Sequence, residues 1–260
     1  SSQLILLFIA IIILFPFLFI LSTSLKSSQE VFLSTRLLPK QICWQNYLEV
    51  LTQGKFGVYL INSILYTIVT VFSVVLISSL AGFVLGRFNF FGKTIFYGLI
   101  LILIMIPVPA AFVSIYNLLM QLGLLNTRIG YLLVLTSGAL PVSIFLMKGF
   151  FEQIPQEIFD AAYIDGCNKF MAYLYILLPL SRPICITIAT FVGVSVWNEF
   201  LLASIVFSDE NFMPIQTGLM RFQGQYITEY EKLMAGVVIA MLPTIILYML
   251  LHKKILSGIT

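Results

Sequence analysis

One stretch of the sequence nearly matches a phosphate-binding loop. Such a loop needs backbone N–H groups around the phosphate, a Lys, and a Ser or Thr for magnesium, spaced as G-x-x-x-x-G-K-[ST]. Gly86 and Gly92-Lys93-Thr94 have the ending, but five residues separate the glycines, one more than the motif allows. The stretch also lies between two apolar segments, not between a strand and a helix. We therefore predict no nucleotide site here and interpret Arg87 and Lys93 as charges that flank membrane spans.

The other reactive residues form no catalytic or metal-binding pattern. His252 is the single histidine, and no Ser-His-Asp arrangement or metal cluster can be assembled around it. Cys43, Cys167 and Cys185 are far apart and show no C-x-x-C spacing. The sequence predicts a chain that is not an enzyme and holds no metal or cofactor of its own.

Glu199 is the one carboxylate within an apolar segment. A charge in that position costs at least roughly 2.5 kcal/mol unless it faces water or a partner, so we expect it to point inward. Two interpretations stay open. Glu199 contacts a ligand or a neighbouring subunit, or it makes a buried hydrogen bond or ion pair that fixes helices together.

The composition excludes a water-soluble domain. Of 260 residues, 60% are hydrophobic and 10% are charged, whereas soluble domains have roughly 25% charged residues. The net charge is only +3, and Lys253-Lys254 is the one adjacent basic pair. The sequence therefore predicts a protein that has the lipid bilayer as its main solvent and that binds no nucleic acid.

Six apolar segments are long enough to cross a bilayer as helices, since a hydrocarbon core of about 30 Å needs roughly 20 apolar residues. We predict an all-α polytopic membrane protein with one transmembrane domain over 1–260 and spans at about 4–25, 58–85, 95–120, 129–150, 184–207 and 233–252. Gly82, Gly86 and Gly138 would allow close helix packing. Lys and Arg number seven on each side of this topology, so charge leaves the orientation open.

The long polar connection 151–183 carries the most information. A connection of this length without structure is unusual, and its pattern predicts two short helices. Pro155 can open the first helix near N1, Gly166 can supply a break, and Pro179 and Pro183 can delimit the second helix. Ala161 and Ala162 would lie on one side of the first helix, where small residues suit docking in another protein's groove.

This connection resembles the EAA loop of ABC importer permeases, whose pattern is E-A-A-x-x-D-G-A, five residues, an aromatic position and I-x-L-P. The matching positions are Asp160, Ala161, Ala162, Asp165, Gly166, Cys167, Tyr173, Ile176, Leu178 and Pro179. Asp160 stands where Glu is usual, and Cys167 where Ala is usual. Because Asp keeps the charge and Cys is nearly as small as Ala, the expected docking role survives both changes.

The resemblance implies the type I ABC importer permease fold, a cytoplasmic N-terminus and the bacterial plasma (inner) membrane as the location. It implies four kinds of partner: a second homologous permease subunit in a heterodimer, two cytoplasmic subunits that bind ATP and Mg, an extracytoplasmic solute-binding protein, and the solute. Coupling to the ATP-binding subunit would fall to Glu157, Asp160, Ala161, Ala162, Asp165, Gly166 and Cys167.

Further motifs are similar to the sugar-importer branch, in particular its MalG-like subunit. They are Leu38-Pro39, Trp44-Gln45-Asn46-Tyr47, Asn62-Ser63, Trp197-Asn198-Glu199-Phe200 and Pro214-Ile215-Gln216-Thr217-Gly218-Leu219. Sugar recognition uses aromatic faces together with amides and carboxylates. Candidates for the solute path, each with helix packing as the alternative role, are Asn62, Tyr66, Tyr116, Asn117, Trp197, Asn198 and Glu199.

The outer connection 208–232 resembles the segment that faces the solute-binding protein. Candidate contacts there are Arg221, Gln223, Gly224, Gln225 and Tyr226, with an ordinary solvated loop as the alternative. Three other functions stay open: an ABC permease for a polyol or glycerol phosphate, a self-sufficient secondary carrier or channel, and a structural scaffold.

Overall fold

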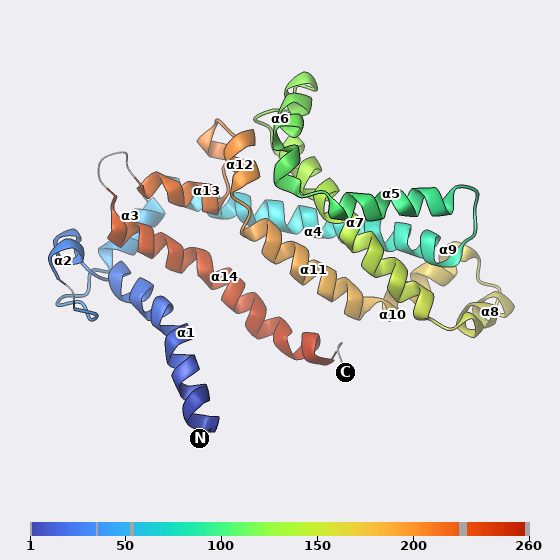
Figure 1. Ribbon diagram of the computed structural model, residues 1–260, viewed down its shortest axis with the longest axis horizontal. Coiled ribbons are helices and arrows are strands. Elements are labelled where there is room, and N and C mark those ends of the chain that lie inside the picture. The colour runs from blue at the N-terminus through green and yellow to red at the C-terminus, as the bar shows by residue number, and fades with distance from the viewer. Residues whose placement is uncertain (1, 35, 53–54, 224–227, 258–260) are drawn as a thin grey trace. The chain divides into compact units, whose positions relative to one another are not determined.

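The computed structural model describes residues 2–34, 36–52, 55–223 and 228–257, and this part of the chain is almost entirely helical (Figure 1). Its one β-type pairing is an isolated bridge between Gln223 and Thr228. The chain forms two compact units. Unit 1 comprises Ser1–Ser63 and Asp209–Met249, and unit 2 comprises Ile64–Ser208 and Leu250–Thr260. The prediction of an all-α protein is confirmed.

Unit 1 begins with a helix that has apolar residues on all sides. In α1 (Ser2–Ser24), none of the most apolar 18-residue window is buried within the chain. A helix that is apolar all round needs an apolar solvent. The remaining elements of unit 1 are α2 (Ser28–Leu33), α3 (Gln45–Thr52), the start of α4 (Phe56–Arg87), η3 (Glu210–Phe212), α13 (Ile215–Leu219), η4 (Met220–Phe222) and most of α14 (Tyr230–Ser257).

Polar contacts fix the connections of unit 1. Asn62 is buried and donates two hydrogen bonds, to the carbonyls of Asn211 at 2.8 Å and Met213 at 3.0 Å. Lys232 pairs with Glu229 at 3.0 Å and with Glu49 of α3 at 3.1 Å. Hydrogen bonds to Glu229 and then Glu49 raise the pKa of Lys232, although desolvation opposes them, so this ammonium group stays charged at neutral pH.

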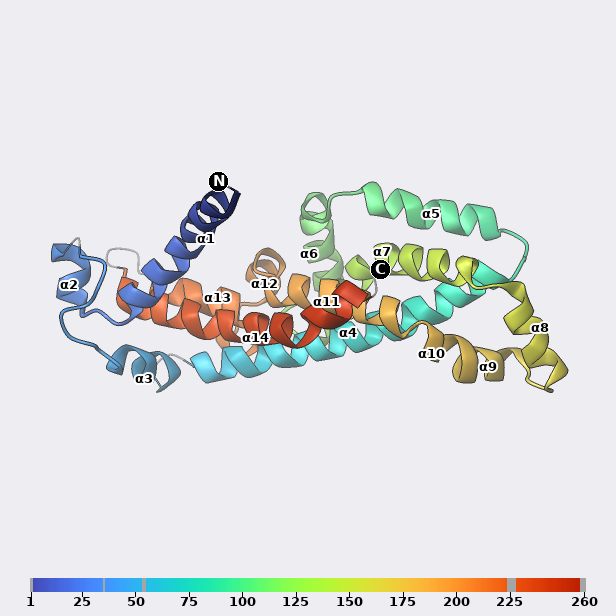
Figure 2. The same ribbon diagram turned by 90° about the horizontal axis from the view of Figure 1, so that it is seen from below.

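Unit 2 is built on long helices that lie side by side (Figure 2). Leu85 of α4, Ile100 of α5 (Lys93–Met105) and Ile144 of α7 (Arg128–Gln153) form one buried apolar cluster. The other elements of unit 2 are η1 (Val108–Ala111), α6 (Phe112–Gln121), α8 (Gln156–Ile164), α9 (Lys169–Ala172), the π-helical η2 (Tyr173–Leu177), α10 (Leu178–Leu180), α11 (Arg182–Trp197) and α12 (Leu201–Val206).

Gly82, one of the small residues expected to allow close packing, lies where α4 packs against α7. A Cβ atom added to Gly82 would lie 2.5 Å from Met147 Cβ and 2.9 Å from Lys148 N. Because the second of these is backbone, a side-chain rotation cannot relieve the clash. Gly138, by contrast, has nothing within 4 Å of such an atom.

Gly82→Ala is therefore expected to destabilise the protein by roughly 1–3 kcal/mol, the usual cost of forcing atoms into a packed interior. Thermal unfolding of the detergent-purified protein measures this effect. The matched control is Gly149→Ala in α7, which has open space at its Cβ and should be neutral or slightly stabilising. Equal effects of the two changes would contradict the tight packing of α4 on α7.

Three helices of the described chain are long and apolar enough to cross a bilayer: Gln3–Ser24, Phe56–Arg87 and Arg128–Gln153. A fourth candidate is the pair Lys169–Leu180 and Arg182–Trp197, which bends by 70°. Lys93–Met105 is apolar but shorter. The placement of six spans in a membrane stays a prediction.

Two predicted spans are interrupted within the structure, which the span boundaries alone do not show. Span 95–120 breaks after Met105, where Ile106 adopts an extended conformation because the residue before a proline disfavours the helical region. Span 184–207 breaks between Trp197 and Leu201. Pro179 also does not end a helix, because it lies within α10, and the 70° bend follows at Ser181.

Candidate functional site

The connection 151–183 folds as the predicted pair of short helices. Pro155 is the N-cap of α8, one position before the predicted N1. Gly166 lies in the turn between α8 and α9 and has φ +81°, a conformation that residues with a Cβ rarely adopt. The side chain of Asn168 then caps α9 by accepting a 2.8 Å hydrogen bond from Met171 N.

The inner face of α8 is fixed to the end of α4. Phe159 is 4% exposed and lies parallel to Phe83, with ring centroids 6.3 Å apart. The guanidinium of Arg87 lies 4.5 Å from the Phe159 ring centroid. Arg87 also donates to the Ile154 carbonyl and to Gln156 Oε1. A cation over an aromatic face contributes about 0.5–1 kcal/mol where it is largely solvated, and Arg87 is half-buried. Arg87 thus joins three positions around the start of α8 to α4.

The second half of the hairpin is held by the same end of α4 and by Phe88, directly after it. Lys169 of α9 lies 4.9 Å from the ring centroid of Phe88. Tyr173 of η2 stacks on Phe83 at 5.1 Å, and its hydroxyl lies 2.7 Å from Ser79 Oγ. The residues from Ser79 to Phe88 thus bind the chain on both sides of Gly166, and we call these contacts the α4 clamp.

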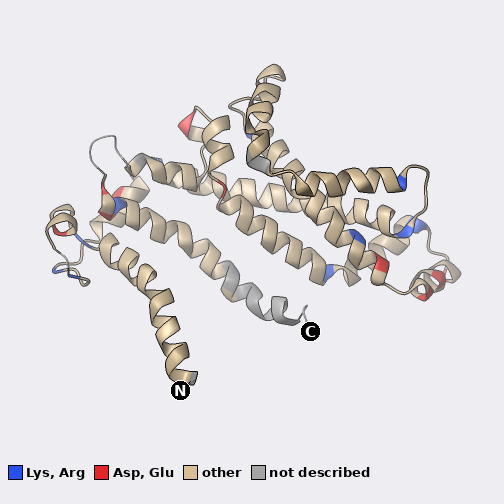
Figure 3. Cartoon of the chain, viewed as in Figure 1, with Lys and Arg blue, Asp and Glu red and all other residues tan. Residues whose placement is uncertain are grey.

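The outer face of α8 is open and carries the acidic residues. Glu157, Asp160, Ala161, Asp165 and Gly166 are exposed, and Cys167 is half-buried. Figure 3 shows acidic residues on α8 and basic residues at the neighbouring helix ends. The long helices that lead away from this end carry few charges. Tyr163 and Ile164 are 40% and 86% exposed, so an apolar surface adjoins the acidic one.

Ala162 does not belong to this outer face. It is 3% exposed and packs inward with Phe159, so the two alanines predicted to share one docking side lie in different environments. The structure thus divides the predicted coupling residues: Ala162 supports the helix from within, and Ala161 is exposed on it.

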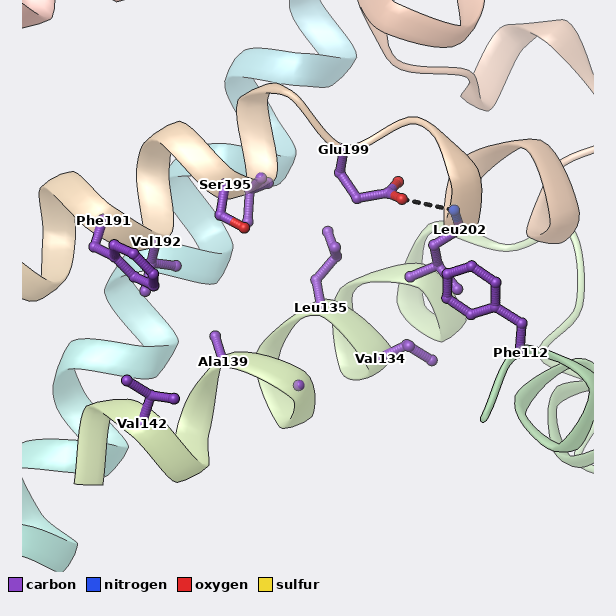
Figure 4. A pocket seen from close by; sticks show the side chains of 12 residues that line it. Phe112, Val134, Leu135, Ala139, Val142, Phe191, Val192, Ser195, Glu199 and Leu202 are labelled. Atoms are coloured by element: carbon purple, nitrogen blue, oxygen red, sulfur yellow. Dashed lines mark hydrogen bonds between the residues drawn. The ribbon is translucent and has the colours of Figure 1, made fainter. Parts of the chain in front are cut away.

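Glu199 lies in the break between α11 and α12, where its carboxylate accepts three hydrogen bonds. Its carboxylate accepts from Leu202 N at 2.6 Å, Ala203 N at 3.0 Å and the Tyr131 hydroxyl at 2.8 Å. It also lies at the edge of a cavity of about 250 Å³ between α7 and α11 (Figure 4). Apart from Glu199 and Ser195, this cavity has a mainly apolar lining.

The other predicted solute-path residues do not form one site in either unit. Asn62 lies in unit 1, where both its donor bonds go to backbone carbonyls. In unit 2, Tyr66 is buried against Tyr131 and Phe207. Trp197 is buried, Asn198 is exposed and donates to the Val194 carbonyl, and Tyr116 and Asn117 are exposed on α6.

The predicted binding-protein contacts fall partly outside the described residues. Gly224, Gln225 and Tyr226 are among the residues that the structure does not describe. Arg221 lies within η4, and Gln223 is exposed and forms the bridge to Thr228.

The comparisons with known proteins assign the family. The family described as the binding-protein-dependent transport system inner membrane component matches residues 78–259. The chain belongs to this family. The match includes α8, α9 and the α4 clamp, so the hairpin with its acidic outer face is part of a transport component of the membrane.

Relatives of this transport component match it over nearly its whole length. The diacetylchitobiose uptake system permease protein NgcG of Streptomyces coelicolor is 30% identical, over 96% of this chain and 84% of that one. The trehalose/maltose transport system permease protein MalG of Thermococcus litoralis is 31% identical, over 96% and 91%. A solved bacterial ABC transporter for import of the polysaccharide alginate has a chain of the same fold, with 24% identity, a TM-score of 0.88 and coverage of 97% and 94%.

Several residues that organise this transport component do not stand out in the sequence. Phe83 is one of many apolar residues in a span and Arg87 is a charge at its end, although both anchor α8. Tyr131 gave no signal, because a single tyrosine in an apolar segment usually only packs. The available signal was Glu199 itself, since a carboxylate in an apolar segment requires partners.

Within the described residues, no group of His, Cys, Asp and Glu could hold a metal ion.

Proposed function

We propose that this chain is the permease subunit of an ABC importer, and that α8 is the point where energy from ATP enters. The observation that carries the proposal is the hairpin itself. Its outer face offers Glu157, Asp160, Asp165 and an exposed Ile164, while the α4 clamp holds its inner face. A docking helix needs both properties. Its partner must be able to reach it, and its movement must be passed on to a long helix.

The partners follow from this role. Two cytoplasmic subunits bind ATP and Mg and hydrolyse ATP, so the permease itself is not catalytic and holds no cofactor. A second homologous permease subunit completes a heterodimer, and an extracytoplasmic protein delivers the solute. In this arrangement α8, the N-terminus and the Gly92 turn lie on the cytoplasmic side of a bacterial plasma membrane.

The transported solute is a sugar, either a monosaccharide or an oligosaccharide. The support is the sugar-importer motifs of the sequence and the two relatives whose names state disaccharide transport. A polyol or glycerol phosphate is the alternative within the same class of transporter.

Transport proceeds by alternating access. Closure of the ATP-binding subunits displaces α8, the α4 clamp passes this displacement to α4, and the helices of unit 2 change their packing. In this scheme Asp160 and Asp165 contact the ATP-binding subunit, and Gly166 gives the hairpin its turn. None of the three binds solute. The binding protein releases solute to the outward-open path, where Arg221, Gln223, Gly224, Gln225 and Tyr226 are candidate contacts.

The test is ATP-dependent uptake by proteoliposomes that contain this chain with the permease, ATPase and binding-protein products of its neighbouring genes. We expect uptake of a labelled sugar that requires both ATP and the binding protein. Uptake of glycerol phosphate but of no sugar would show that the solute is not a sugar. Uptake by this chain alone without ATP would identify a secondary carrier instead, and full uptake by a complex lacking this chain would leave only a scaffold role.

A further inference from the structure

The break between α11 and α12 is organised by one side chain. The first N–H groups of a helix have no partner within it, and an α11 that continued without interruption would bond the amides of Leu202 and Ala203 to carbonyls four residues earlier. Both amides instead donate to the Glu199 carboxylate, at 2.6 and 3.0 Å. Glu199 N bonds to the Val196 carbonyl only three residues back, at 3.2 Å. The carboxylate therefore stabilises an interruption of the helix.

The same carboxylate ties the start of α12 to α7. Tyr131 donates to Glu199 Oε2 at 2.8 Å, and the Tyr131 side chain is fully buried. Its ring contacts Tyr66 and Phe207, each at a centroid distance of 4.9 Å. Close packing on two sides leaves the Tyr131 hydroxyl little freedom to move away from Glu199.

The far end of α12 is bonded to the segment that leads into α7. Asn126 N donates to the Val206 carbonyl at 3.0 Å, and Ser208 N donates to Asn126 Oδ1 at 3.1 Å. Because α7 begins at Arg128, both ends of α12 are attached to α7 or to its N-terminal connection. The attachment of α12 to α11, in contrast, is the interrupted segment 198–200.

We propose that Glu199 and Tyr131 are positioning residues that latch α12 to α7, so that α11 changes its angle at 198–200 during transport while α12 stays in place. The inference rests on the proposed function, because it assigns the latch a role in the transport cycle. Glu199 is then committed to three groups of its own chain and is not a solute ligand, which decides between the two roles left open by the sequence.

Hydrogen exchange tests the latch without any transport assay. Peptides that cover 199–207 are compared in the purified wild-type protein and in Glu199→Ala and Tyr131→Phe. Loss of a charge-assisted hydrogen bond to a backbone amide should accelerate exchange in Glu199→Ala by about tenfold or more. Tyr131→Phe should give a smaller acceleration of the same peptide. Unchanged exchange in both variants would overturn the latch.

Uptake by the complete transporter tests the role of the latch. Glu199→Ala should lower the maximal rate by about tenfold with the KM for solute-loaded binding protein unchanged, and Tyr131→Phe by about threefold. The double variant should be no slower than Glu199→Ala, because residues that act as one unit are not additive. Ser137→Ala is the matched control, since Ser137 is exposed on α7 and its hydroxyl donates to the Val134 carbonyl of the same helix.

The outcomes separate the two proposals. If Glu199 were a solute ligand, Glu199→Ala would change the KM or the solute preference, the effect of Tyr131→Phe would add to it, and the latch role would be wrong. If the wild-type complex imports nothing, the proposed function fails, while the exchange experiment still reports whether the latch exists.

Discussion

Replacement of Gly166 by valine is expected to reduce solute uptake by at least tenfold while the protein still folds and inserts. Gly166 has φ +81° and open space around the position of a Cβ atom. The cost therefore comes from the backbone, at roughly 1–2 kcal/mol, and a β-branched residue is the worst fit at positive φ. The turn should relax by rotating α8 away from α9, which misplaces the outer face of α8. ATP-dependent uptake, normalised to folded protein, measures the effect.

Gly123→Val is the control for backbone strain alone. Gly123 has φ +66° and also has open space at its Cβ, but it lies in the connection between α6 and α7, away from the hairpin. We expect uptake within about twofold of wild type for this variant. A comparable loss in both variants would mean that the Gly166 effect reflects folding and not docking. Co-purification of the ATP-binding subunit with each variant adds a direct measure of docking.

Replacement of Phe83 by alanine is expected to separate ATP hydrolysis from transport. Phe83 is 6% exposed and lies at the centre of the α4 clamp, where its ring contacts Phe88, Phe151, Phe159 and Tyr173. Truncation of a buried Phe costs about 3–5 kcal/mol locally. Because the outer face of α8 is untouched, ATP-binding subunits should still dock. Their hydrolysis should persist while uptake falls at least tenfold, which parallel ATPase and uptake assays would detect.

Two further variants sharpen this test. Phe96→Ala in α5 removes a ring of the same size from a side chain that is 55% exposed, and it should leave both activities unchanged. Arg87→Lys keeps the charge but loses the planar guanidinium, so it should give a partial loss of uptake. Loss of ATPase and uptake in parallel, with release of the ATP-binding subunits, would show that the clamp serves assembly and does not transmit movement.

The sequence predicted the long helices well because each depends on a local property. Apolar length identified α1, α4 and α7, and the proline and glycine pattern located the α8 hairpin at Pro155 and Gly166. The sequence marks the break at Ile106, because a proline disfavours the helical conformation of the residue before it, and Ile106 precedes Pro107. It does not mark the break at 198–200, since an apolar run does not show where the backbone changes direction.

The outer face of α8 was predictable from the sequence, but the α4 clamp that holds its inner face was not. The acidic and small residues of α8 stand in a recognisable order in the chain. The clamp instead joins residues such as Ser79 and Tyr173, which are 94 positions apart, and nothing local marks such pairs. For the same reason Glu199 was recognised as a residue that needs partners, but Tyr131, 68 positions away, could not be named.

One helix links the clamp and the latch. Within α4, Tyr66 contacts Tyr131 beside the latch and Phe83 contacts Phe159 in the clamp. The 17 helical steps from Tyr66 to Phe83 span about 26 Å at 1.5 Å per residue. No proline interrupts α4, whereas α1, α7 and α14 each contain one. A stiff rod between two sites couples them, and coupling between two equilibria is reciprocal. The affinity of α8 for its ATP-binding partner should then differ between the closed and the open latch by the same factor with which that partner changes the latch equilibrium.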